Sequence, residues 1–195
     1  IIEPRLRWPV EQKITSHFAE QKVIDLTRRG KYILIHLKDG ICLIHLGMSG
    51  HMKAVPPSTP LKKHDHFEIV TEDKIIRYND TRRFGFILWH DDPKTIYQHP
   101  RLKILGPEPL SDNFNFSYLI KKAHNRSIPI KSFIMDAKIV VGVGNIYANE
   151  ALFLSKIHPS CSTRKVKESK LANLVKNIKT VLEKSIKSGG TTLQD

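Results

Sequence analysis

The stretch from residue 140 to residue 150 reads Val-Val-Gly-Val-Gly-Asn-Ile-Tyr-Ala-Asn-Glu. We expect Gly142 and Gly144 to adopt turn conformations that other residues avoid, and Asn145 to cap the helix that follows. Such a helix start points N–H groups and the positive end of the helix dipole outward. The stretch therefore predicts an anion site suited to a phosphate. The alternative interpretation is a plain tight connection with Asn145 as an ordinary cap.

Helical patterns surround this stretch. Apolar residues at 116, 119, 120 and 123 share one face of a predicted helix, and residues 129–137 predict a short helix with proline near its first turn. After the helix over residues 146–155, apolar residues from Leu171 to Ile186 mark a long amphipathic helix that ends at Gly189-Gly190. The second half of the chain is thus predicted to be a helical domain.

The first half has the pattern of an antiparallel sheet. Short β-rich runs cover residues 31–37, 41–46, 67–71, 74–78 and 86–89. Asp39-Gly40 predicts a hairpin with a positive φ at the turn, and residues 11–19 predict a short helix. The fold class is therefore α+β, with an antiparallel β-sandwich over residues 1–104. A proline-containing linker, 105–111, then leads to the helical domain, 112–195.

The charge of the chain indicates a polyanionic partner. Its 195 residues carry 32 Lys+Arg against 19 Asp+Glu, a net charge of +13 and a pI near 9.8. Such a balance favours nucleic acid, although ribosomal RNA or an anionic membrane surface would select the same composition. Neither an apolar run of about 20 residues nor a signal peptide is visible, so we expect a cytoplasmic protein.

Two cysteines, Cys42 and Cys161, cannot form a disulfide framework or a four-cysteine zinc site. A reducing compartment is expected, and no metal or other cofactor is predicted within this chain. The chain starts at Ile1 rather than at methionine and stops at Asp195 without a recognisable end. We therefore expect it to be a fragment.

Several polar or exposed residues are candidates for function at the strand ends. Lys31 follows Arg28-Arg29-Gly30 and would project from a strand end, although most lysines of a basic protein are only solvated surface charges. Met48 stands between Gly47 and Gly50 after a strand. Methionine usually fills a core, but at such a tip it could insert between DNA bases.

His64-Asp65-His66 and Asp80 to Gly85 are two further candidates. A metal site at the first is unfavourable because alternate residues of one strand do not converge; structural hydrogen bonding, or a phosphate contact through His64, remains open. In the second, Arg82 and Phe84 suit a loop that stacks on a base and contacts phosphate. The alternative there is a surface pair between Arg83 and Asp80.

Seven motifs, taken together and in order, closely resemble the formamidopyrimidine-DNA glycosylases, bacterial enzymes that excise 8-oxoguanine and ring-opened purines. They are Arg-Arg-Gly-Lys-Tyr (28–32), His-Leu-Gly-Met-Ser-Gly (45–50), Lys-His-Asp-His (63–66), Asp-Thr-Arg-Arg-Phe-Gly (80–85), Leu-Gly-Pro-Glu-Pro-Leu (105–110), Val-Gly-Val-Gly-Asn-Ile-Tyr (141–147) and Gly-Gly-Thr-Thr (189–192). The resemblance implies a β-sandwich, a helix-two-turn-helix domain and a DNA-binding cleft between them. It also implies that the protein is a monomer and that its partner is double-stranded DNA with oxidised bases.

The resemblance also implies roles for individual residues. Lys31 resembles the active-site lysine near the lesion phosphate. Met48, Arg82 and Phe84 resemble the triad that fills the space left by the flipped nucleotide. The residues that resemble backbone-phosphate contacts are His64 and Asn145, with Arg126 or Lys131 in place of a family lysine whose position holds Ser127.

Two parts of the family pattern have no match in this sequence. The family nucleophile is an N-terminal proline followed by glutamate, and its zinc finger carries four cysteines after Gly-Gly-Thr-Thr. We therefore expect this fragment to be inactive by itself, with zinc bound only in a finger outside it. Two other readings stay open: an endonuclease VIII-like glycosylase for oxidised pyrimidines, and a non-catalytic DNA- or RNA-binding module.

Overall fold

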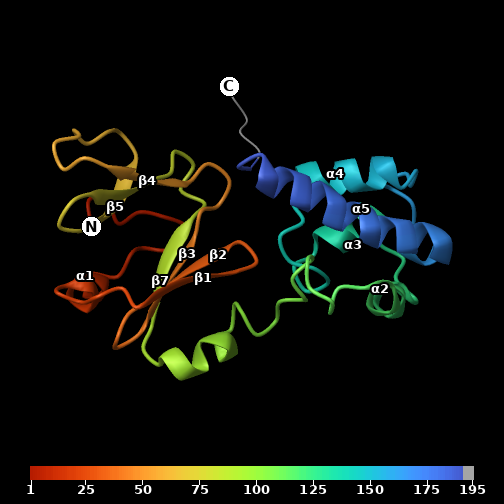
Figure 1. Cartoon of the computed structure of the whole chain (residues 1–195), viewed down its shortest axis with the longest axis horizontal. Helices are drawn as coiled ribbons and strands as arrows, with labels where there is room; N and C mark the ends of the chain where they lie inside the picture. Colours follow the sequence, from red (N-terminus) through yellow and green to blue (C-terminus); the bar gives the residue numbers. More distant parts are fainter. Residues whose placement is uncertain (191–195) are drawn as a thin grey trace. The chain divides into compact units, whose positions relative to one another are not determined.

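The computed structural model describes residues 1–190, in two compact units. The first unit is Ile1–Lys103 and the second begins at Ile104. The first unit holds two antiparallel sheets, and the second holds helices (Figure 1). The α+β fold class predicted from the sequence is confirmed. The last two residues of the Gly-Gly-Thr-Thr motif, Thr191 and Thr192, lie outside the described residues.

The two sheets of the first unit have four and three strands. The strand order is β1-β2-β3-β7 in the larger sheet and β4-β6-β5 in the smaller one. The strands are β1 (Asp25–Arg29), β2 (Tyr32–His36), β3 (Ile41–His45), β4 (His51–Val55), β5 (Asp65–Val70), β6 (Ile75–Asn79) and β7 (Phe86–His90). Five of them fall on the predicted β-rich runs.

Strands β1 and β4 were not predicted from the sequence. Both are edge strands, and all their residues are exposed or half-buried. An edge strand pairs on one side only and can be polar, so its sequence lacks the apolar alternation that predicts a strand. Arg28 and Arg29, which precede the first predicted β-rich run, therefore lie in an unpredicted strand, β1.

Glycines fit the two hairpin turns of the larger sheet for different reasons. Gly30, between β1 and β2, has a φ of +57°. Gly40, between β2 and β3, does not have the positive φ expected of it, and instead lies against Trp89. A Cβ at Gly40 would come within 2.2 Å of the Trp89 ring, so close packing excludes a side chain there.

The core of the first unit lies between the two sheets. Ile35, Cys42, Ile44 and Ile87 of the larger sheet pack with Phe67 and Tyr78 of the smaller one. The short helix α1 (Lys13–Phe18) contributes Ile14 to this cluster. The other face of the larger sheet also buries side chains, Leu34 and Leu43 among them. A 3₁₀ helix, η1 (Pro93–Gln98), follows β7.

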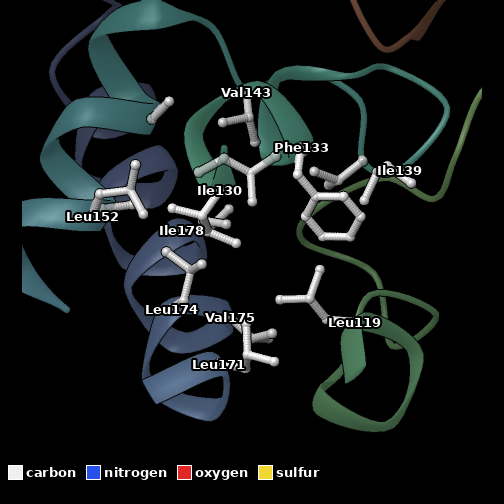
Figure 2. Packing of buried hydrophobic residues seen from close by; sticks show 14 of the residues in the cluster. Leu119, Ile130, Phe133, Ile139, Val143, Leu152, Leu171, Leu174, Val175 and Ile178 are labelled. Atoms are coloured by element: carbon white, nitrogen blue, oxygen red, sulfur yellow. The ribbon is translucent and has the colours of Figure 1, made fainter. Parts of the chain in front are cut away.

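The second unit is a cluster of helices around one apolar core. It contains α2 (Phe116–Ala123), α3 (Ile130–Met135), α4 (Asn145–Leu154), a 3₁₀ turn η2 (Thr163–Lys165) and α5 (Glu168–Lys187). Figure 2 shows Leu174 and Ile178 of α5 converging on the side chains of the other helices. Each such fully buried side chain stabilises the fold by roughly 1.5–3 kcal/mol.

The stretch between the predicted domains is bonded to the second unit. The N–H of Gly106 donates to the carbonyl of Ala137 at 2.8 Å, and Val141 N–H donates to the carbonyl of Pro107 at 3.2 Å. A Cβ at Gly106 would lie 2.5 Å from the Ile139 carbonyl oxygen. These contacts hold the approach to α4 in place. Within residues 1–190, every helix is too short or too polar to cross a membrane.

Candidate nucleic-acid interface

Three strand ends of the larger sheet meet beside Lys31. Tyr32, the first residue of β2, pairs with His45, the last residue of β3. His45 pairs in turn with Phe86, the first residue of β7. Lys31 directly precedes β2, so it lies at the same end of the sheet as the exit of β3 and the entry of β7.

Strand ends of the smaller sheet lie at the same end of the sandwich as Lys31. Asn79, the last residue of β6, pairs with His51 at the start of β4 and with Asp65 at the start of β5. Residues 46–50 therefore connect β3 to β4, and residues 80–85 connect β6 to β7, both across one end of the sandwich. We call Lys31, His64 and the segments 46–50 and 80–85 the loop end. Five of the eight predicted site residues lie there: Lys31, Met48, His64, Arg82 and Phe84.

Met48 and Phe84 project from two segments that touch each other. The Met48 side chain is 72% exposed and that of Phe84 is 44% exposed, so neither fills the core. A Cβ at Gly47 would lie 2.6 Å from the backbone nitrogen of Gly85, which places the two segments in backbone contact. The Arg82 guanidinium stands 4.7 Å from the centroid of the Phe84 ring, a cation–π distance. The structure thus brings Met48, Arg82 and Phe84 together.

His45, the last residue of β3, adjoins the loop end but was not selected from the sequence. Its ring stacks on Phe86 with 5.2 Å between centroids, and its Nδ1 accepts the N–H of Gly47 at 3.0 Å. With Nδ1 as acceptor, the neutral ring carries its proton on Nε2. Its position directly before Leu-Gly-Met-Ser-Gly, at the end of a predicted strand, was the signal that could have identified it.

Positive charge gathers around His45. Burial lowers the pKa of His45, and the charges of Lys31, Arg7 and Arg101 lower it further. The Arg101 guanidinium also lies 3.9 Å from the Trp8 ring centroid. An anion entering this group of cations would relieve their mutual repulsion, which makes the loop end suited to a phosphate.

The three residues of the His-Asp-His motif differ in burial and in the bonds that they make. His66 is fully buried, with its ring nitrogens 3.0 Å from the carbonyl oxygens of Glu3 and Asp80. Asp65 is buried, accepts from the side-chain amide of Asn79 and from the backbone N–H of Lys62, and forms an ion pair with Arg77 at 3.6 Å. His64 alone is half-buried, with a φ of +73°. His66 and Asp65 are therefore structural, and His64 is the one whose ring can reach a ligand.

The start of α4 differs from the prediction in one respect. Asn145 is the first helical residue rather than the cap, and Gly144 is the N-cap, with φ −93° and ψ −176°. The reason is that the carbonyl of Gly144 already accepts the N–H of Ala148 at 2.9 Å. Only Gly142 has the positive φ expected of both glycines, at +81°. The exposed Asn145 side chain therefore stands in the first turn of α4, beside the positive end of the helix dipole.

Arg126 and Lys131 lie on two other segments of the second unit. Arg126 is exposed between α2 and α3, and its carbonyl accepts the N–H of Arg164 at 2.8 Å. Lys131 is half-buried in the first turn of α3, where its N–H donates to the carbonyl of Pro159 at 3.2 Å. These bonds fix the backbone of both residues, and their contact with DNA stays a prediction.

Comparison with known proteins decides the family. Residues 1–87 match the formamidopyrimidine-DNA glycosylase N-terminal domain, and residues 105–195 match the formamidopyrimidine-DNA glycosylase H2TH domain. The chain is 48% identical over 194 residues to a formamidopyrimidine-DNA glycosylase of Acidithiobacillus ferrooxidans, covering 99% of this chain and 71% of that protein. A Legionella pneumophila relative of the same name is 49% identical, over 98% of this chain and 69% of its own length. The chain belongs to the formamidopyrimidine-DNA glycosylase family.

Solved structures of this family share the fold. A Lactococcus lactis Fpg variant, in complex with DNA containing Fapy-dG, superposes with a TM-score of 0.92 at 28% identity, covering 99% of this chain and 71% of that one. Lactococcus lactis Fpg in complex with abasic-site DNA gives the same TM-score and identity, over 98% and 71% of the two chains. Both of these proteins are therefore similar to our chain over nearly all of its length.

The residues present do not fit a zinc site of the kind that the family resemblance implies. Cys42 is fully buried in the first unit, where burial raises its pKa, and Cys161 belongs to the second unit. In the part of the chain that the structure describes, no three His, Cys, Asp or Glu side chains form a metal-binding group. The zinc finger implied by the family resemblance therefore stays a prediction, and the described residues of this chain would not form it.

Proposed function

We propose that this protein acts in base-excision repair, as a glycosylase and lyase that removes oxidised purines such as 8-oxoguanine and formamidopyrimidines from double-stranded DNA. Membership of the family supports this, as does the net charge of +13, which favours a polyanionic partner. The relatives that carry this name are bacterial, and a chromosomal substrate would place the protein in the cytoplasm.

The observation that carries the proposal is the composition of the loop end. Two exposed apolar side chains, Met48 and Phe84, stand on touching segments, in the same loop end as Lys31. A surface that combines apolar tips with cations suits DNA whose base has been extruded, since the tips can fill the gap while the cations meet phosphate. Extrusion costs a few kcal/mol, which the inserted side chains would offset.

The proposal gives each candidate residue a role. Met48 and Phe84 fill the space left by the extruded nucleotide, and Arg82 faces the base left without its partner. Lys31 lies near the lesion phosphate and assists elimination at the sugar. The remaining four residues, His64, Asn145, Arg126 and Lys131, contact backbone phosphates.

The chemistry follows from the family resemblance. A secondary amine attacks C1′ of the extruded sugar, the damaged base leaves with the bonding electron pair, and a Schiff base forms. Loss of a proton from C2′ then allows the 3′ phosphate to depart. In these steps the residues of this chain hold the sugar and phosphate beside Lys31. Met48 and Phe84 keep the extruded base from returning to the base stack.

The proposal can be tested by assaying this chain beside the Acidithiobacillus ferrooxidans relative. The probes are duplexes that carry one 8-oxoguanine, one thymine glycol or no lesion, with fluorescence anisotropy to measure affinity over a range of salt. We expect the chain to prefer the 8-oxoguanine duplex and to show a steep loss of affinity with salt. Preference for thymine glycol would favour the endonuclease VIII-like alternative. Equal affinity for all three duplexes would favour a non-catalytic binding module and overturn the proposal.

A further inference from the structure

A buried carboxylate lies under the exposed side chains of the loop end. Asp80 is fully buried, and its Oδ2 accepts the N–H of Gly85 at 2.8 Å and the hydroxyl of Tyr78 at 3.2 Å. Its Oδ1 accepts the hydroxyl of Ser49 at 2.5 Å and the N–H of Arg82 at 3.3 Å. One side chain thus bonds to both segments that cross the end of the sandwich.

These hydrogen bonds keep the carboxylate charged. Burial alone would raise the pKa of Asp80, but the bonds from Ser49, Gly85, Tyr78 and Arg82 hold it below its usual value. Hydrogen bonds to a charged acceptor are about twice as strong as bonds between neutral groups. Asp80 is therefore a firm anchor for both segments.

Ser49 completes the connection between the segments. Its hydroxyl donates to Asp80 and accepts the N–H of Arg82 at 3.1 Å. Ser49 is the neighbour of Met48, so this single hydroxyl ties the Met48 turn to the backbone of Arg82. The close approach of Gly47 to Gly85 holds the two backbones together on the other side of the turn.

The position of Asp80 is itself fixed from the start of β5. The N–H of Asp80 donates to the carbonyl of His64 at 3.1 Å, and the carbonyl of Asp80 lies 3.0 Å from His66 Nε2. Arg83, three residues after Asp80, is held in the left-handed region at φ +57°, which is uncommon for an arginine and needs support from the surrounding structure. The loop is therefore determined by buried bonds and not by its exposed residues.

We propose that Asp80 and Ser49 are a positioning pair that joins the Met48 turn and the Arg82–Phe84 segment into one rigid wedge, so that the three exposed side chains enter damaged DNA together. This inference rests on the proposed function. Two independent loops would each lose conformational freedom on insertion, whereas a wedge that is already ordered loses little. The pair lies beneath the DNA-facing surface, so it acts through the backbone.

The first test is on the free protein. In Ser49→Ala, amide hydrogen exchange at Arg82 and Gly85 should quicken about tenfold, because a typical hydrogen bond contributes about that factor to local opening. Ser58→Ala, at an exposed serine outside the loop end, is the matched control. Faster exchange in residues 46–50 alone, with Arg82 and Gly85 unchanged, would show that the segments are not coupled and would overturn the inference.

The second test measures insertion. The probe is a duplex with a tetrahydrofuran abasic-site analogue and a neighbouring 2-aminopurine, whose fluorescence rises when it is unstacked. We expect Ser49→Ala to lower affinity for this duplex about tenfold and to slow the fluorescence rise, with less than a twofold change for an undamaged duplex. Asp80→Asn should act in the same direction and also lower thermal stability.

The two proposals fail in different ways. Wild-type protein that shows no preference for the abasic-site duplex would overturn the proposed function, and with it the role of the pair on DNA. Wild-type preference that Met48→Ala abolishes and Ser49→Ala leaves intact would overturn the positioning pair only.

Discussion

The loop end of the first unit and the start of α4 in the second unit are both candidate DNA-contacting surfaces, but they are fixed by different means. At the loop end, the buried Asp80 carboxylate and the Ser49 hydroxyl bond to each other across the two segments and to the backbone N–H groups of Arg82 and Gly85. At the start of α4, the N-cap Gly144 makes no side-chain capping bond. Here the flanking Val141, Val143 and Ala148 are buried, so apolar packing holds the helix start.

This difference shows how each surface should respond to mutation. At the loop end, the buried hydrogen bonds hold the segments that carry the proposed DNA-contacting residues, so we expect a polar substitution to change both stability and binding. At α4, no side chain caps the helix start and Asn145 is exposed, so we expect removal of its side chain to leave the fold intact. The four predictions that follow, from the largest expected effect to the smallest, test this contrast.

Gly85→Ala should have the largest effect. A Cβ there would lie 1.8 Å from the Tyr78 hydroxyl and 2.7 Å from the His45 carbonyl oxygen, so the buried core of the loop end must shift. We expect a loss of about 3 kcal/mol in the free energy of unfolding, measured by urea denaturation. Gly142→Ala, at φ +81° with only Pro109 nearby at 3.9 Å, is the matched change before α4 and should cost about 1–2 kcal/mol. Equal losses would contradict the contrast.

Val143→Ala should destabilise the second unit by about 2 kcal/mol, because two buried methyl groups are lost and a small cavity is left. Asn145→Ala, two residues away, should change the free energy of unfolding by less than about 0.5 kcal/mol. Thermal denaturation followed by circular dichroism would measure both. A large loss in Asn145→Ala would show that the helix start depends on this side chain after all.

Asn145→Ala should instead weaken binding to duplex DNA by about 1 kcal/mol, roughly fivefold, if the amide bonds to a phosphate. The loss should be similar for all sequences, since a phosphate carries no sequence information. Asn149→Ala, exposed one turn further along α4, is the matched control and should bind as the wild type does. Equal affinities of Asn145→Ala and wild type at low salt would refute the phosphate contact.

The stability of the first unit should fall as the pH is lowered below about 6.5, the ordinary pKa of histidine. Because burial and the nearby cations lower the pKa of His45 in the folded state, the unfolded chain takes up the proton first. The stability present above pH 6.5 is therefore lost as the pH falls through the pKa of folded His45. His45→Gln should flatten this part of the profile of unfolding free energy against pH. An unchanged slope in the mutant would assign the dependence to another group.

The sequence predicted the parts of this molecule whose patterns are local. Five strands, the four α-helices of the second unit and the class of the fold follow from apolar periodicity and from turn residues. The edge strands β1 and β4 were not predicted, because an edge strand can be polar and then lacks the alternating apolar pattern. Gly40 was interpreted through its backbone freedom, whereas its neighbour Trp89, 49 residues away in sequence, is what excludes a side chain.

The candidate site was predicted in its exposed residues and missed in its buried ones. Met48, Arg82 and Phe84 could be selected because an apolar tip between glycines and an arginine beside a phenylalanine suit a DNA-contacting loop. Lys31 was selected through the family resemblance, since a single lysine of a basic protein is not unusual. His45 and Ser49 were passed over because their importance comes from burial and from bonds between segments about 30 residues apart. Asp80 was considered only as a surface partner of Arg83, which is wrong, because Asp80 is buried and bonds to Ser49, Tyr78, Arg82 and Gly85. Such bonds depend on tertiary structure, which a single sequence does not display.

The two tryptophans of the chain lie at opposite ends of the sandwich. Trp8 packs edge-on against Phe86, with Arg101 over its ring, whereas Trp89 stacks on His17 with 4.3 Å between centroids, next to the turn at Gly40. Intrinsic emission therefore provides a paired optical signal without a label. Arrival of a polyanion should perturb the Trp8 component alone, and the Trp89 component serves as an internal reference in the same cuvette.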